Sequence, residues 1–596
     1  MHLNFMTLAA AADLNRITLA SWDWIVIALF FVAMIWIVWD VSRKKKETSG
    51  DYFLSGRSAT WIAIGASIFA SNIGSEHLIG LAGSGAVAGL SQSHWEFHAW
   101  VLVMMSWVFL PFYYNSGVST MPEFLERRFG SKARWILSLV SLAAYVLTKI
   151  SVTVFAGALF FEVMMPEVQL TIGGTVVSSF WIGAVATVVL AGVYSSIGGL
   201  SAVVYTDLVQ TGIILAGTLS VTGFALYHLG HSGVALPDGQ TAQSICDGWQ
   251  VLKATIKSTG NVEQFGLWHS LSHKAFPWLG VVVASATIGV WYWCTDQFII
   301  QRTLAAKNMT NARRGAIWGG FLKLAPVFLF LVPGMLGFAL HHNHVVINGA
   351  AFAIPLKEGG ALNGDTVFPT LVQTLLPVGF RGLVVAGMIA ALMSSLASLF
   401  NSVSTLFTVD VYQKLKPETS QKKLVVIGRT TTVVMTALGL LWLPIMKAIS
   451  GGGLYQYIQS VQAFLAPPIV AVFLTGLLWK RMNLRGACWG LGLGFVLGMA
   501  KLAANAIWGT PTEAAFIQDF YFSGILLVTS FIIVIVASLT APAPDYAHLD
   551  GLNFSCLSPE YKKANRASWN WIDVVASIFV VGCVIAAYAY FWTWLD

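Results

Sequence analysis

Charged residues are scarce in this sequence. Of its 596 residues only 10% are charged, against roughly 25% in an ordinary soluble domain, while 56% are hydrophobic. A soluble chain of this length would form several domains, and so few charges cannot cover their surfaces. The composition therefore excludes a soluble enzyme and predicts a membrane protein. The 24 Trp and 55 Gly agree, because Trp gathers at membrane interfaces and Gly lets spanning helices approach closely.

Cysteine is also rare, and its spacing follows no pattern. The five cysteines show no CxxC spacing, so neither a zinc site nor a disulfide framework is indicated. Residues 1–16 lack a basic segment followed by an apolar core and a cleavage site, so we expect the first span to be retained. The net charge of +7 is expected to orient the chain in a membrane rather than to bind nucleic acid.

Long apolar runs are abundant. A bilayer core about 30 Å thick needs roughly 20 apolar residues as a helix, and this measure predicts an all-α polytopic protein with about fourteen transmembrane helices. They are expected at 22–41, 61–84, 96–118, 135–163, 178–196, 199–227, 276–300, 315–340, 368–400, 424–446, 452–479, 486–508, 519–541 and 571–594.

Six connections between these spans are basic: 43–46, 127–134, 307–314, 414–423, 480–485 and 562–566. With fourteen spans all six lie on one side, which the positive-inside rule makes cytoplasmic. Both termini are then expected outside. The long outer connections are 228–275 and 341–367. The three histidines between 341 and 344 favour a solvated loop over a metal site, because no carboxylate or cysteine stands at ligand spacing beside them.

Two spans are interrupted by polar residues. In the second span, 71–77 reads SNIGSEH, and in the seventh, 291–297 reads WYWCTDQ. A broken helix frees backbone carbonyls that can coordinate a cation, and aromatic faces among hydrogen-bonding groups suit a sugar. If spans two to six and seven to eleven are two repeats, the breaks open each repeat at corresponding positions, which is typical of a secondary transporter.

Further polar residues lie inside the predicted spans. An ionisable group at mid-membrane costs at least about 2.5–3.5 kcal/mol, so each one is a functional hypothesis by default. Simpler interpretations stand beside this one: the serines as small packing residues, Lys149 as the structural partner of a carboxylate, and Glu96 as a solvated interface residue. The candidates are Glu96, Lys149, Asp207, Lys323, Ser394, Ser395, Ser398, Tyr455, Tyr457 and Gln459.

Four segments resemble the sodium/glucose cotransporter family of the sodium:solute symporters. Residues 68–85 (IFASNIGSEHLIGLAGSG), 291–310 (WYWCTDQFIIQRTLAAKNMT), 390–410 (AALMSSLASLFNSVSTLFTVD) and 457–480 (YIQSVQAFLAPPIVAVFLTGLLWK) are similar to its first, sixth, eighth and tenth core helices. The resemblance implies a leucine-transporter-type fold of five helices plus five inverted ones, with one helix before and three after. The expected regions are 1–60 (N-terminus and preceding helix), 61–228 (first repeat), 229–275 (outer loop), 276–480 (second repeat) and 481–596 (three C-terminal helices and a cytoplasmic linker).

The same resemblance implies the site residues. Tyr292 is similar to the aromatic that closes the site from the cytoplasm, and Tyr455 to an outer-gate aromatic. Neutral oxygen ligands suit Na⁺, a hard cation that must be released again. The sodium site falls on Ala70, Ile73, Ala391, Ser394 and Ser395, and the sugar contacts fall on Asn72, His77, Glu96, Tyr292, Trp293, Lys323 and Gln459.

A second ion would bind near Asp207 and Ser398. Relatives that move two sodium ions carry a hydroxyl where this chain has Ala397, so we expect one Na⁺ per sugar. Gly289 stands where some relatives offer a polar side chain, which leaves the identity of the sugar open.

The expected function is Na⁺-coupled symport of a monosaccharide of the glucose or galactose type, with Na⁺ as the co-transported ion and the lipid bilayer as surroundings. Alternatives are symport of inositol or a sugar acid, and a sugar-gated sensor or channel with the same fold. An enzyme is disfavoured because the intramembrane groups contain no nucleophile–base pair or metal cluster. We expect a multi-pass plasma-membrane protein, and the lack of a long outer loop with cysteine pairs favours a bacterial inner membrane.

Overall fold

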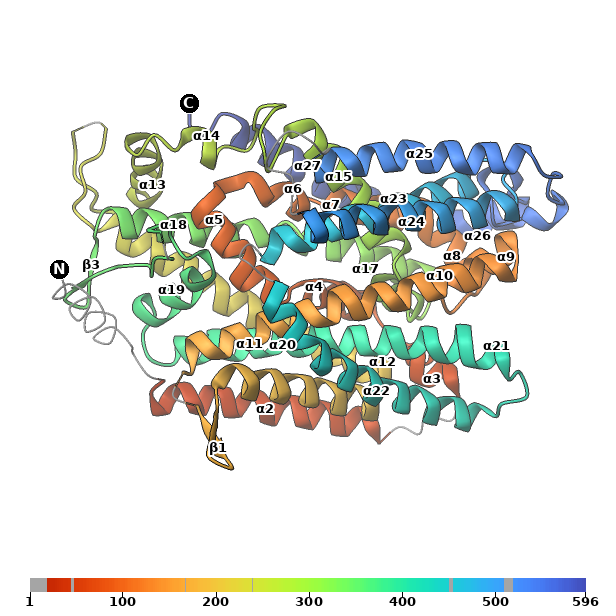
Figure 1. Cartoon of the computed structure of the whole chain (residues 1–596), viewed down its shortest axis with the longest axis horizontal. Coiled ribbons are helices and arrows are strands. Elements are labelled where there is room, and N and C mark those ends of the chain that lie inside the picture. The colour runs from red at the N-terminus through yellow and green to blue at the C-terminus, as the bar shows by residue number, and fades with distance from the viewer. Residues whose placement is uncertain are drawn as a thin grey trace.

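The computed structural model describes residues 19–43, 48–166, 168–237, 239–357, 359–449, 454–508 and 518–596. Most of them form helices that run along the long axis of the molecule (Figure 1). The crossing helices are α2 (Ser21–Ser42), α4 (Trp61–Asn72) with α5 (Ala82–Ala88), α7 (Ala99–Met104) with α8 (Leu110–Ser116), α10 (Ser131–Ala144) with α11 (Ser151–Met164), α12 (Ser179–Gly230), α15 (Trp278–Gly289) with α16 (Gln297–Leu304), α17 (Met309–Leu322) with α18 (Val332–His342), α20 (Phe380–Thr405), α22 (Gln421–Ile449), α23 (Leu454–Leu478), α24 (Leu484–Trp508), α25 (Asp519–Leu539) and α27 (Trp571–Trp592).

Short elements connect or interrupt these helices. The connecting helices are α3 (Ser49–Phe53), α6 (Ser93–Glu96), α9 (Met121–Phe129), α13 (Asp247–Ser258), α14 (Val262–Phe265), α19 (Val367–Leu375), α21 (Gln413–Leu415) and α26 (Pro559–Ala567). Wide π-helical turns occur at η2 (Glu76–Leu81), η4 (Met105–Phe109), η5 (Tyr145–Ile150), η6 (Val290–Thr295), η7 (Val327–Leu331) and η9 (Leu406–Tyr412). Strand β1 (Leu170–Ile172) pairs antiparallel with β2 (Thr175–Val177), as β3 (Val346–Ile347) does with β4 (Ala350–Ala351).

The number of crossings agrees with the sequence. Eleven stretches of the described residues are long and apolar enough to cross a membrane. One of them, α12, has 52 residues, nearly 80 Å of helix at about 1.5 Å per residue, and it is broken at Gly199, where φ is 55° and ψ is −159°. A second stretch joins the end of the second span to the third. Each of these two stretches contains two crossings, which raises the number from eleven to thirteen. Helices α10 and α11, which together form one more crossing, bring the described residues to fourteen.

Glycine is required at the break in α12. A β-carbon at Gly199 would lie 2.6 Å from the carbonyl oxygen of Tyr52, and its positive φ is one that residues with a side chain rarely adopt. The chain therefore turns from the fifth to the sixth crossing against α3 without a connecting loop.

The two predicted helix breaks are present and have nearly the same geometry. Ile73, the residue after α4, has φ −82° and ψ 108°, and Asp296, the residue after η6, has φ −82° and ψ 128°. Beyond the second break, the Asp296 carboxylate accepts a hydrogen bond from the Phe298 N–H and so caps α16. Each break lies in the first crossing of an expected repeat, although the repeat limits themselves stay a prediction.

The described basic connections gather at one end of the bundle, with α3, α9, α21 and α26 (Figure 1). Lys414 contacts Glu126 at 2.9 Å, and Arg313 donates to Ser568 at 2.7 Å. The described parts of the long connections 228–275 and 341–367 lie at the opposite end (Figure 1), where the Lys257 ammonium donates to the backbone oxygen of Asp596 at 2.6 Å. The chain therefore has one basic end and one end that carries the long loops.

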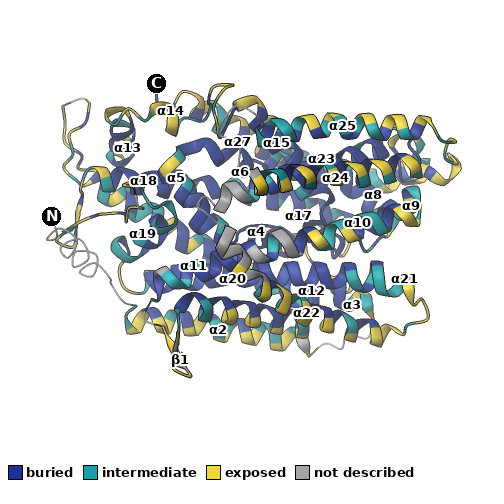
Figure 2. Cartoon of the chain, in the orientation of Figure 1, coloured by how far each residue is buried: buried dark blue, intermediate teal, exposed yellow. Residues whose placement is uncertain are grey.

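Helix α20 forms the buried centre of the bundle (Figure 2). In its apolar stretch 94% of the residues are buried, against 17% in α2 and 22% in α27. Helices α2 and α27 therefore have the apolar exposed surface of lipid-facing helices, while α20 packs against α12 and α4.

Candidate functional site

All seven predicted sugar-contact residues line one cavity beside the two helix breaks. The empty space there is about 740 Å³ when the open solvent at its mouth is included. Small-molecule sites are typically such concave pockets, with a few polar groups among apolar and aromatic walls. The seven residues are Asn72, His77, Glu96, Tyr292, Trp293, Lys323 and Gln459.

A buried ion pair forms one wall of the cavity. The Lys323 ammonium donates to Glu96 Oε2 at 2.6 Å and to Asn72 Oδ1 at 2.7 Å. On the other side of the same carboxylate, His77 Nε2 lies 3.5 Å from Glu96 Oε1. Glu96 is only 1% exposed, so the interpretation of it as a solvated interface residue is wrong. Because a buried charge without a partner costs several kcal/mol, each member holds the other in place.

Aromatic rings form a second wall. The Asn72 amide donates to the Tyr292 hydroxyl at 3.2 Å, which links the first break to the second. The Lys149 ammonium pairs with Asp296 and lies 4.5 Å from the centre of the Tyr292 ring. Structural pairing, the simpler interpretation of Lys149, agrees with these contacts. The pair fixes the aromatic segment of η6 against η5.

Gln459 enters the cavity from α23. The side chain is 6% exposed, and its Oε1 has no hydrogen-bond partner among the described residues. Such an atom is available to a ligand hydroxyl. The other residue predicted in this helix, Tyr455, lies outside the residues whose side chains the structure describes.

Of the predicted sodium ligands, Ser395 lines the cavity itself. The Ser395 hydroxyl donates to the carbonyls of Ser71 and Ile73, at 3.1 and 3.2 Å. At the break, the Gly74 N–H points to His77 Nδ1 at 3.4 Å instead of to the carbonyl of Ala70, so that carbonyl loses its usual helical donor. Ala391 lies in the same turn of α20 as Ser394 and Ser395.

Ser394 faces a different partner. Its hydroxyl donates to Asp207 Oδ1 at 2.6 Å, and Ser67 donates to Asp207 Oδ2 at 2.5 Å. Ser398 joins this group through Ser71, whose hydroxyl lies 2.9 Å away. The region predicted for a second ion is therefore one hydrogen-bonded network that reaches the break in α4.

Arg302 belongs to this network, and sequence reasoning missed it. It is 1% exposed, and its Nε donates to the hydroxyls of Ser71 and Ser67 at 2.9 and 3.1 Å. The available signal was an arginine five residues after the second break, which must find a buried anionic partner. Ser67 and Ser71 also donate to Asp207, so these two hydroxyls connect the guanidinium to the carboxylate.

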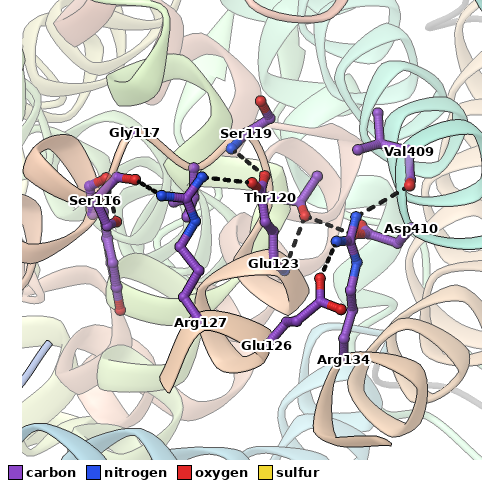
Figure 3. A network of polar contacts seen from close by, with 12 residues as sticks. Ser116, Gly117, Ser119, Thr120, Glu123, Glu126, Arg127, Arg134, Val409 and Asp410 are labelled. Carbon is purple, nitrogen blue, oxygen red and sulfur yellow. Dashed lines mark hydrogen bonds and ion pairs between the residues drawn. The ribbon is translucent and has the colours of Figure 1, made fainter. Parts of the chain in front are cut away.

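A second polar cluster lies at the basic end, outside the cavity (Figure 3). Arg134 pairs with Asp410 at 2.6 Å and with Glu126 at 2.5 Å, and Thr120 donates to Asp410 at 2.8 Å. Burial raises the pKa of Glu126, but hydrogen bonds from Lys414 and Arg134 outweigh it and hold that pKa below its usual range. The cluster fastens α9 and α10 to the end of the ninth crossing. In the sequence these charges indicated only orientation.

Comparison with protein families identifies the chain. The model of the sodium:solute symporter family matches residues 52–494. The chain belongs to this family. As a sodium:solute symporter it is a secondary transporter and not an enzyme, with Na⁺ as the coupling ion, and it is a multi-pass membrane protein.

Several curated relatives are similar over most of this symporter. Sodium/glucose cotransporter 1 of Oryctolagus cuniculus is 39% identical over 576 residues, which cover 93% of this chain and 84% of the relative. Sodium/glucose cotransporter 2 of Rattus norvegicus is 39% identical over 552 residues, covering 89% and 80%. Sodium/myo-inositol cotransporter 2 of Oryctolagus cuniculus is 35% identical over 562 residues, covering 91% and 80%.

A solved structure shares the fold of the symporter. A Na⁺-coupled sialic acid symporter, in a substrate-bound outward-open state, superposes with a TM-score of 0.68 at 18% identity and covers 88% of this chain and 99% of its own. With the family match, this confirms the predicted leucine-transporter-type architecture.

Proposed function

We propose that this protein is a Na⁺-coupled symporter of a neutral monosaccharide of the glucose or galactose type, working by alternating access with one Na⁺ per sugar. One observation carries the proposal: the seven predicted sugar contacts line one cavity, and Ser395 joins that cavity to the carbonyls of the broken helix. The relatives named sodium/glucose cotransporters support it.

The charge of the cavity favours a neutral substrate. Lys323 is paired with Glu96, and Lys149 is paired with Asp296. Glu76 also lines the cavity. No cation among the described lining residues is thus left over for a carboxylate, which usually requires an arginine or a free helix N-terminus. The same amide, carboxylate and ammonium groups suit hydroxyls, while the rings of Tyr292 and Trp293 suit the apolar face of a sugar.

The binding of Na⁺ and of sugar is coupled because the two proposed sites use neighbouring residues of the same helix break. Ile73 offers its carbonyl on the ion side of the break, and the next residue back, Asn72, offers its side chain to the cavity. A Na⁺ ion on the carbonyls orders the break and thereby the sugar contact. Sugar binding then shifts the equilibrium between the outward-open and inward-open states, which interconvert by rocking of the two repeats. Tyr292 acts as the inner gate and Tyr455 as the outer one.

A single Na⁺ agrees with the polar network behind the cavity. Arg302 donates to Ser67 and Ser71, which also contact Asp207. A fixed guanidinium there repels a second cation, and Ala397 offers it no hydroxyl. Asp207 and Ser398 then act as a support for the ion site.

A second candidate is symport of an inositol. The relative named sodium/myo-inositol cotransporter 2 favours it, and an inositol ring presents the same hydroxyls to the same groups.

For the molecule in its membrane we propose a cytoplasmic basic end, both termini outside, and a bacterial inner membrane as its location.

Uptake into proteoliposomes tests the proposal. Labelled glucose, galactose and myo-inositol are offered with an inward Na⁺ gradient and, as the control, with K⁺ alone. Accumulation of a hexose above equilibrium only with Na⁺ is expected. Accumulation of myo-inositol alone would replace the substrate, and Na⁺-dependent binding without accumulation would make the protein a sensor.

A further inference from the structure

His98 lines the same cavity but is absent from the predicted sugar contacts. It follows α6 by two residues and is 4% exposed. Two elements hold it from opposite sides. On one side its Nε2 lies 3.2 Å from the Ser285 hydroxyl of α15, and on the other the Trp293 indole N–H meets its Nδ1 at 3.3 Å.

These contacts fix the proton of the imidazole. An indole N–H can only donate, so Nδ1 is the acceptor and the proton of the neutral ring sits on Nε2. Ser285 directs its own hydroxyl proton to the carbonyl of His94 at 3.1 Å, which leaves its oxygen free to accept from His98. The chain of donors runs from Trp293 into His98, from His98 to Ser285 and from Ser285 to the backbone.

The ring also fills a defined space. A β-carbon built at Gly289 would lie 3.0 Å from His98 Nε2 and 3.1 Å from Cδ2 and from Cε1. Real β-carbon contacts are rarely so short, and the three similar distances place the face of the ring over Gly289. The imidazole therefore stands where a side chain at position 289 would project.

We propose that His98 shapes the sugar site beside Trp293, as the positioning residue of the indole and as the occupant of the space above Gly289. The inference rests on the proposed function. A tilt of the indole changes which face of a sugar it covers, so His98 determines specificity without being part of the ion site.

The test combines substitutions at the two positions. His98→Ala and Gly289→Ala are each expected to raise the half-saturating glucose concentration about tenfold. The double variant is expected to be no worse than the worse single one, because the new methyl group occupies the vacated space. Multiplication of the two effects would overturn the proposal.

Two further variants separate the roles of the ring. His98→Asn keeps an acceptor for Trp293 and is expected to retain most of the glucose affinity, while His98→Phe keeps the bulk over Gly289 but loses the acceptor and is expected to lose affinity. Equal losses in both would show that the hydrogen bond is not what matters. His269→Asn is the matched control and is expected to leave the glucose affinity unchanged, because His269 is a buried histidine outside the lining of the cavity and outside this chain of donors.

A Na⁺ readout distinguishes positioning from general damage. The rise in melting temperature that Na⁺ causes without sugar is expected to be the same in all variants and the parent, and its loss in His98→Asn would overturn the proposal. If the parent itself accumulates neither hexose nor inositol, the proposed function fails. If it accumulates a hexose but the effects multiply, only the role of His98 fails.

Discussion

At the scale of single residues, the proposed ion ligands and a proposed sugar contact lie on different helices. Ser395 reaches the carbonyl of Ile73, and Ser394 reaches Asp207. Gln459 approaches the cavity from a different helix, α23, and has no contact with these serines among its described hydrogen bonds. Substitutions at the two places should therefore affect different ligands first.

The first prediction uses this separation. Ser394→Ala and Ser395→Ala are expected to raise the half-saturating Na⁺ concentration at least fivefold, since each removes an oxygen or its support from the ion site. Gln459→Ala is expected to raise the half-saturating sugar concentration while Na⁺-induced thermal stabilisation without sugar is kept. Unchanged Na⁺ activation in Ser394→Ala would mean that the ion site is misplaced.

The second prediction concerns the buried pair Lys323–Glu96. Glu96→Gln leaves the ammonium without its counter-charge inside the bundle, which costs about 3–5 kcal/mol when a buried pair is broken. We expect sugar uptake to be lost and the melting temperature to fall. Lys323→Met combined with Glu96→Gln should recover melting temperature but not uptake. If the double variant melted no higher than Glu96→Gln, the charge imbalance would not be the cause.

At the scale of elements, helix α2 not only lies at the edge of the bundle but also binds the start of α20. Asp23 is 0% exposed, and its Oδ1 accepts from the backbone N–H groups of Gly379 and Gly382 at 2.7 and 2.9 Å. These groups lie at the start of α20, where a carboxylate satisfies free N–H groups and opposes the helix dipole. The preceding helix therefore caps the helix that carries the proposed ion ligands.

Removal of this cap is the third prediction. Asp23→Ala is expected to destabilise the fold by on the order of 3 kcal/mol, because it leaves one buried and one partly buried N–H group without an acceptor and Arg381 without its carboxylate. Asp23→Asn keeps the acceptor and should cost less. The melting temperature of the purified protein checks the order. Equal losses for the two variants would mean that charge, not hydrogen bonding, is what α20 needs.

The fourth prediction concerns a stripe of glycines in α24. A β-carbon at Gly490 would lie 2.4 Å from Val534 and 2.9 Å from Val472, so the helix is wedged between α25 and α23. Gly490→Leu is expected to cost at least about 1–3 kcal/mol through overpacking. Gly492→Leu is the matched control, since nothing lies within 4 Å of its β-carbon. Similar melting temperatures for both variants would contradict the packing.

The elements also show what the sequence could and could not predict. Hydropathy gives the crossings because each must be long and apolar, and the two breaks stand out as polar interruptions. The contacts that hold the breaks in place were not predictable, because they join residues far apart in the sequence. Arg302 donates to Ser67 and Ser71, which precede it by 235 and 231 residues. Likewise, nothing in the local pattern around His98 places it against Gly289, since that contact exists only once α6 packs on α15.

At the scale of the whole molecule, the coupling of Na⁺ to sugar is set by the complete transport cycle. If one Na⁺ accompanies one neutral sugar, each turnover moves one positive charge, and a negative interior adds about 2.3 kcal/mol per charge per 100 mV. Na⁺ must then raise sugar affinity by the same factor by which sugar raises Na⁺ affinity. The proposed site, with the Ile73 carbonyl toward the ion and the adjacent Asn72 side chain toward the sugar, has the means for this reciprocity.

The fifth prediction is therefore a reversal potential. In proteoliposomes with fixed Na⁺, a tenfold sugar gradient is expected to shift the potential at which net uptake vanishes by about 59 mV for one charge per sugar, against about 30 mV for two. The smaller value would show a second ion, and Asp207 with Ser398 would be its place. In that case Asp207→Asn should restore the larger value by removing only the second ion. With a single ion, the same variant weakens Na⁺ binding through Ser394 but leaves the 59 mV shift unchanged, because stoichiometry does not depend on affinity.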